Sequence, residues 1–145
     1  MIRDPNYAAR VRASFAKQQF MATLGASMTT VRPGEVIIEL PFRADLTQQH
    51  GFLHAGVVTS VIDSACGYAA LTLMPPGMEV LSVEFKVNLL APAHGSAFQA
   101  HGRVVRAGRT LTVCTGELRV RGVESVVAMM QATMMAVAGR SDRQD

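Results

Sequence analysis

The sequence predicts an α+β domain in which one antiparallel sheet wraps around a long apolar helix. The helix is indicated by residues 55–73, a mostly apolar run that Pro75-Pro76-Gly77 ends. The sheet is indicated by shorter runs of alternating or apolar residues, which glycine and proline turns separate. Because so apolar a helix needs cover on all sides and one sheet covers only part of it, the pattern also favours association with a second copy.

The composition limits both the class of protein and its partners. Of 145 residues, 49% are hydrophobic and 17% are charged, which fits a single folded domain and excludes intrinsic disorder. The formal charge of +3 comes without a block of like charges, so no nucleic-acid partner is expected. Cys66 and Cys114 form neither a disulfide framework nor a cluster with zinc spacing, so we expect no metal and no other cofactor. The first residues lack the apolar core of a signal peptide, which predicts a cytoplasmic protein.

The order of elements follows from the pattern along the chain. An amphipathic helix is predicted over 6–23, with Val11 and Phe15 on its buried face, Arg10 on its solvent side and Gly25 at its end. Strands are predicted at 27–32, 35–42, 80–90, 96–107, 110–121 and 124–138, with a polar loop at 43–54. The domain prediction is an N-terminal helical extension over 1–24, a single domain over 25–140 and a frayed tail over 141–145.

Residues 55–74 approach the length of a bilayer span, but Asp63 near their middle costs about 2.5–3.5 kcal/mol in a membrane. We therefore expect a buried helix and no membrane span.

The strand predicted at 80–90 has one polar face. Ser82, Glu84 and Lys86 alternate with apolar residues, which predicts that these three side chains share that face.

The residues that carry chemistry surround the start of the apolar helix. The first-turn N–H groups at Ala55 and Gly56 lack partners within the helix and can polarise a carbonyl or stabilise an oxyanion. Asp63 is the one ionisable residue in the helix and could act as general base or nucleophile, or form a structural hydrogen bond. Eight residues of helix place Asp63 about 12 Å from Ala55, too far to share one reacting carbonyl within a chain. The spacing therefore predicts a composite site across a two-fold axis.

These residues resemble the hotdog-fold acyl-CoA thioesterases, and most closely the phenylacetate-degradation subgroup. The resemblance is carried by Gln48-x5-His54-Ala55-Gly56-x6-Asp63, by the segment that begins Ser82-Val-Glu-Phe-Lys-Val-Asn, and by Gly108-Arg109-Thr110-Leu111. It covers residues 24–138 and implies a hotdog fold, an antiparallel sheet around a long central helix, to which an N-terminal helix is added.

The resemblance also implies a role for each matching residue. Asp63 matches the catalytic carboxylate, Gln48 the side chain that orients water or thioester, and Ser82 a hydroxyl near the attacking water. Ala55 stands where the family usually has glycine; its N–H survives this change, and with Gly56 it forms the oxyanion site. Substrate binding is expected from three residues: His54, which could instead cap the helix, and Arg106 and Arg109, placed to meet the CoA phosphates.

The function predicted from this resemblance is hydrolysis of an acyl- or aryl-CoA thioester to a free acid and CoA by a homodimer or a dimer of dimers. Two alternatives stay open. One is a hotdog-fold enoyl-CoA hydratase or dehydratase, which pairs a histidine with an acid. The other is an acyl-CoA-binding protein without catalysis.

Overall fold

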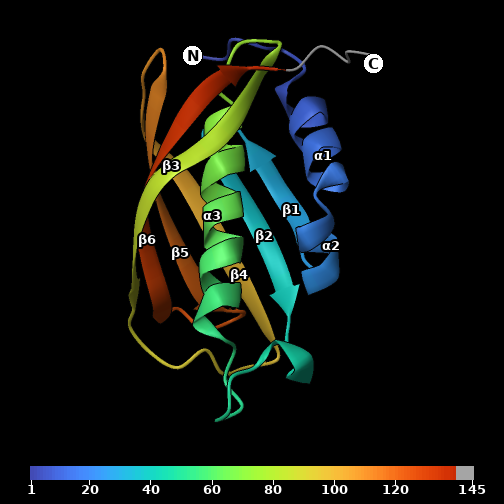
Figure 1. Ribbon diagram of the computed structural model, residues 1–145, viewed down its shortest axis with the longest axis vertical. Helices are drawn as coiled ribbons and strands as arrows, with labels where there is room; N and C mark the ends of the chain where they lie inside the picture. Colours follow the sequence, from blue (N-terminus) through green and yellow to red (C-terminus); the bar gives the residue numbers. More distant parts are fainter. Residues whose placement is uncertain (140–145) are drawn as a thin grey trace.

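The computed structural model describes residues 1–139, which form one six-stranded antiparallel sheet with helices on one face (Figure 1). The long helix α3 (Ala55–Leu71) runs along the middle of that face, as the hotdog fold requires. The strands lie in the order β1-β2-β4-β5-β6-β3, so β1 and β3 form the two edges. The remaining elements are α1 (Tyr7–Lys17), α2 (Gln19–Leu24), β1 (Ser27–Arg32), β2 (Glu35–Pro41), a short 3-10 helix (Ala44–Leu46), β3 (Met78–Leu89), β4 (Ala97–Ala107), β5 (Leu111–Val120) and β6 (Val126–Ala138).

The alternating residues of β2 show why the sheet has one buried face. Val36, Ile38 and Leu40 are almost fully buried, whereas Glu35 and Glu39 on the opposite face are only partly so. The strand pairs with β1 through the Pro33–Gly34 turn and with β4 on its other side. The predicted strand pair and its buried face are therefore confirmed.

The contact between α3 and the sheet depends on two glycines that are paired across β4 and β5. A Cβ atom on Gly102 would lie 2.3 Å from the Ala65 carbonyl carbon, and one on Gly116 would lie 2.4 Å from a methyl group of Ile62. No other residue leaves room for a helix this close to a sheet. The two glycines thus fix how deeply α3 sits.

The N-terminal helix differs from its prediction in two respects. The helix breaks at Gln18, whose extended backbone (φ −80°, ψ 94°) separates α1 from α2. Arg10 is not directed to solvent: its guanidinium donates to the carbonyl oxygens of Leu71 and Met74 at 3.0 and 2.7 Å, at the end of α3. Charge-assisted bonds to carbonyls at and just after a helix C-terminus are favourable, so the extension is anchored to the central helix.

Strand β3 contains a β-bulge that the alternation did not predict. Its pairing with β6 shifts between Ser82 and Glu84, so Ser82 pairs with the buried Met134 while Glu84 pairs with Thr133. The prediction that Ser82 shares a face with Glu84 and Lys86 is therefore wrong. The extra residue, Val83, reverses the phase of the strand and lets Ser82 face α3.

Several large apolar side chains of the edge strand β3 and the turn after it are exposed. They are Leu81, Val83, Phe85, Leu89 and Leu90, each exposed by 46–55%. Within residues 1–139, no helix is both long and apolar enough to cross a membrane. The predicted tail over 141–145 lies outside the described residues.

Replacing Gly102 with alanine should lower the free energy of unfolding by about 1–3 kcal/mol, because the new methyl group would overlap the α3 backbone. Chemical denaturation measures this loss. Gly67→Ala is the matched control, since its Cβ would have only a 3.9 Å contact with Met134 Sδ and alanine favours a helix. Equal losses in the two variants would contradict the proposed close contact.

Candidate active site

The loop before α3 ends in an unusual helix cap. His54 is the N-cap residue, and its Nδ1 accepts a hydrogen bond from the Gly56 N–H at 2.8 Å. A Cβ on Gly56 would lie only 2.9 Å from that nitrogen, so glycine is needed for the cap to form. Among the described residues, no group accepts a hydrogen bond from the N–H of Ala55. The first amide of α3 is thus a free donor, whereas the second is occupied.

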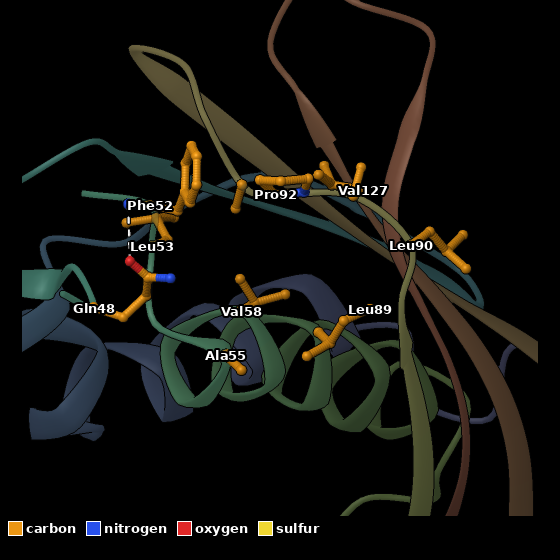
Figure 2. Close-up of a pocket in the computed structure, with 11 residues that line it drawn as sticks. Gln48, Phe52, Leu53, Ala55, Val58, Leu89, Leu90, Pro92 and Val127 are labelled. Atoms are coloured by element: carbon orange, nitrogen blue, oxygen red, sulfur yellow. Dashed lines mark hydrogen bonds between the residues drawn. The ribbon is translucent and has the colours of Figure 1, made fainter. Parts of the chain in front are cut away.

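Gln48 is held by the backbone of its own loop. Its Oε1 accepts from the N–H of His50 at 2.5 Å and from that of Phe52 at 3.4 Å. Because two backbone donors require the oxygen at this position, the amide nitrogen is directed the other way. Figure 2 shows this nitrogen pointing into the pocket above Val58. Gln48 therefore presents a donor, in a fixed orientation, near the start of α3.

A cavity of about 470 Å³ lies beside these donors, and we refer to it as the Gln48 cavity. In Figure 2 it lies between the loop, the first turn of α3 and the end of β3. Its wall is mostly apolar and consists of Gln48, Phe52, Leu53, Ala55, Val58, Leu89, Leu90, Ala91, Pro92, Ala93 and Val127. A cavity with a few polar groups in an apolar wall is typical of small-molecule sites.

Asp63 lies in a second, smaller cavity of about 130 Å³, the Asp63 cavity. The carboxylate is half-buried and accepts a hydrogen bond from Ser82 Oγ at 2.6 Å. The bulge in β3 makes this bond possible, since it directs Ser82 toward α3. The carboxylate is oriented by this hydroxyl and reaches an open space, as a general base or nucleophile requires.

The rest of the Asp63 cavity comes from residues that the sequence analysis did not select. Ser14 and Gln18 belong to the N-terminal extension, and Tyr68 lies on α3. Ser14 Oγ donates to the Tyr68 hydroxyl at 3.4 Å, and Ser64 Oγ donates to Gln18 Oε1 at 3.4 Å. Burial raises the pKa of Tyr68; the hydrogen bond from Ser14 opposes this shift and the charge of Glu79 adds to it. The hydroxyl is therefore neutral at physiological pH.

The structure brings four of the predicted site residues to two cavities, places His54 and Gly56 in the cap of α3, and leaves two arginines apart. Gln48 and Ala55 line one cavity, and Asp63 and Ser82 line the other. Arg106 and Arg109 line neither; both are exposed near the β4–β5 turn, which Figure 1 shows at the opposite end of the molecule from the loop before α3.

The two cysteines are buried packing residues. Burial raises the pKa of Cys114 to about 12 and is the main cause that raises the pKa of Cys66 beyond its usual range. A thiol with so high a pKa is a poor nucleophile. Within residues 1–139, no group of three or more His, Cys, Asp or Glu side chains could hold a metal ion.

The helix cap can be separated from any contact with substrate. His54→Ala should lower the free energy of unfolding by about 1 kcal/mol, whereas His54→Asn should keep a cap and most of the stability. Thermal unfolding measures the stability of both variants, and KM for the hydrolysis of an acyl-CoA thioester is determined for each. If both variants raise KM while only alanine loses stability, the imidazole also contacts the substrate; equal losses of stability would contradict the capping role.

Comparisons with known proteins agree with this architecture. Residues 50–127 match the thioesterase superfamily. The chain is 54% identical to a thioesterase family protein from Silicibacter pomeroyi, whose structure superposes with a TM-score of 0.88 over 92% of this chain and 99% of that one. Human acyl-coenzyme A thioesterase 13 is 24% identical over 125 residues, 85% of this chain and 89% of that protein. The E. coli PaaI protein from the phenylacetic acid degradation operon has the same fold, with a TM-score of 0.85 at 17% identity over 96% of this chain and 98% of its own. The chain belongs to the thioesterase superfamily and is a hotdog-fold thioester hydrolase with PaaI-like relatives.

Proposed function

We propose that this thioester hydrolase cleaves acyl-CoA in a site that two protomers build together. The observation that carries the proposal is the separation of the two groups of site residues. The free N–H of Ala55 belongs to the Gln48 cavity, and the carboxylate of Asp63 belongs to the other. Eight residues of α-helix span about 12 Å, so one chain does not bring both groups to a single carbonyl.

The exposed edge of the sheet supports a dimer. Strand β3 has 12 residues and, within residues 1–139, pairs only with β6, so its other side offers backbone groups that no described strand pairs with. The exposed Leu81, Phe85 and Leu89 lie along it. A long apolar edge strand is an aggregation hazard unless it is covered, and a second β3 related by a two-fold axis would cover it. Such pairing would carry the start of one α3 toward the Asp63 of the partner.

The chemistry of this composite site needs only groups that the chain supplies. The thioester oxygen would accept a hydrogen bond from the Ala55 N–H, at the positive end of α3, while the Gln48 amide orients the substrate. In the general-base route, water adds to the carbonyl carbon and gives its proton to Asp63 of the other protomer. The C–S bond then breaks, the free acid forms and CoA leaves as the thiol. In the nucleophilic route, Asp63 attacks the carbonyl carbon, the C–S bond breaks, and CoA leaves as the thiolate. Water then hydrolyses the mixed anhydride, which releases the free acid and restores the Asp63 carboxylate.

The cavities suggest where the parts of the substrate lie. The apolar wall of the Gln48 cavity suits an acyl or aryl group. Two-fold symmetry would place the arginines of one protomer's β4–β5 turn at the partner's end of the site, where Arg106 and Arg109 could meet CoA phosphates. The hydratase alternative gains no support at these cavities, because no carboxylate of the described residues pairs with His54, and the His101–Glu35 pair lines neither cavity. We further propose that the enzyme is cytoplasmic and needs no metal or other cofactor.

Asp63→Asn should lower kcat for acyl-CoA hydrolysis by about 10²–10⁴-fold, because the amide neither accepts a proton nor attacks the thioester. The rate is measured by the release of the CoA thiol. Cys66 and Cys114 are buried, so their thiols do not react in this assay. The matched control is Asp45→Asn, the same chemical change at an exposed carboxylate that pairs with Arg43. Full activity of the Asp63 variant would exclude the proposed mechanism.

Ala55→Pro tests the shared site, since it removes the amide donor at a position where proline is compatible with the fold. Ala55 is the first residue of α3, and His54 before it already has the extended conformation (φ −60°, ψ 139°) that proline prefers. We expect kcat to fall by about 10²–10³-fold while circular dichroism stays unchanged.

Mixing the two inactive variants provides the decisive measurement. A heterodimer of Ala55→Pro and Asp63→Asn keeps one complete site if each site takes Ala55 from one chain and Asp63 from the other. Random reassembly of equal amounts should therefore restore about a quarter of the wild-type activity. If both groups of one site came from a single chain, mixing would restore nothing.

A further inference from the structure

The N-terminal extension forms a wall of the Asp63 cavity, although it lies outside the residues that match the superfamily. That match covers 50–127, whereas Ser14 and Gln18 belong to α1 and the α1–α2 break. Both side chains line the same cavity as Asp63 and Ser82. The extension is therefore part of the surroundings of the carboxylate.

The extension is held firmly enough to position a side chain. Val11 and Met21, on either side of the break, are 0% and 1% exposed. Arg10 binds the carbonyl oxygens at the end of α3, and Phe15 packs edge-on against Tyr68 with ring centroids 5.8 Å apart. Since both flanking helices are fixed, the break places Gln18 beside α3, where its Oε1 accepts from Ser64.

The cavity holds negative charge and offers few donors. Glu79, at the start of β3, is the second carboxylate in its wall, and Tyr68 is neutral. The buried thiol of Cys66 lies close by on α3, and Met134 of β6 contacts Ser82. No arginine, lysine or histidine of the described residues lines this cavity. The amide nitrogen of Gln18 is the neutral N–H donor of the wall.

We infer that Gln18 is a positioning residue for hydrolysis, whose amide nitrogen orients water in the Asp63 cavity toward the carboxylate. This inference rests on the proposed function, because it assigns Asp63 to water. The volume of about 130 Å³ is large enough to hold water beside the carboxylate. With Oε1 engaged by Ser64, the Gln18 amide has a defined direction and does not add to the negative charge beside Asp63.

The experiment compares Gln18→Glu with Gln19→Glu, measuring kcat/KM for acyl-CoA hydrolysis as a function of pH. The acid limb of this profile reports the essential base of the free enzyme. A third carboxylate in the cavity disfavours the charged form of Asp63, so Gln18→Glu should move the acid limb up by about half a unit to one unit. Gln19 is exposed on α2 and outside the cavity, so its variant should keep the wild-type profile.

A second variant tests the donor itself. Gln18→Ala should lower kcat by roughly tenfold with little change in KM, because the water loses one oriented donor. If Gln18→Glu fails to fold, Gln18→Ala still tests the inference. Wild-type kcat and an unmoved acid limb in the folded Gln18 variants would overturn the inference.

The outcomes separate the two proposals. If Asp63→Asn is inactive and the Gln18 variants behave like wild type, only the role of Gln18 is lost. If Asp63→Asn stays active, the acid limb does not report Asp63, and both proposals fail. A shift of the acid limb in Gln18→Glu shows that residue 18 shares the cavity with the essential base. A lower kcat in Gln18→Ala, with KM and thermal unfolding unchanged, supports the inference, since a merely structural role would not lower kcat alone.

Discussion

The structure depends on the close contact between α3 and the paired Gly102 and Gly116. At this point the backbone of Ala65 and Cys66 rests on Gly102 of β4, and the side chains of Ile62 and Cys66 rest on Gly116 of β5. Consecutive helical residues are about 100° apart, so a helix fixed through Ala65 directs Asp63, two residues earlier, to roughly the opposite side. The contact that fixes the depth of the helix therefore also fixes its rotation. It directs the only carboxylate of α3 away from the sheet interior and toward Ser82 and the N-terminal helices.

The bulge in β3 has a comparable effect on the other partner of Asp63. Without the extra residue, Ser82 would share a face with Glu84 and Lys86 and could not reach α3. With it, the strand supplies a hydroxyl to the carboxylate, and the same strand ends in Leu89 beside the Gln48 cavity. One edge strand thus contributes to both cavities. This explains why its free edge, if it pairs with a second copy, would bring complementary halves of two sites together.

The fold could be predicted largely because its signals are local. The apolar run of α3, the alternation in β2 and the Pro33–Gly34 turn each act within a few residues. The bulge could not be predicted, since the phase of β3 is set by its pairing with β6 and not by its own alternation. The direction of Arg10 could not be predicted either. Its position in the helical pattern indicates solvent, but the carbonyl oxygens of Leu71 and Met74, which it binds, lie more than 60 residues later in the chain. Both misses are cases in which tertiary contacts override a local pattern.

The candidate site shows the same division between local and distant information. Gln48, Ala55 and Asp63 stand in one segment at fixed spacings, so their resemblance to a known motif is visible in the chain. Tyr68 shares α3 with Asp63, but Gln18 and Ser14 approach Asp63 because Arg10 and Phe15 bind the extension to α3. A motif identifies the groups that perform a reaction, but the charge and water around them come from whatever the fold packs alongside. In this chain the wall of the Asp63 cavity comes from the extension, α3 and β3, so substitutions in the wall can change the surroundings of the carboxylate without moving it.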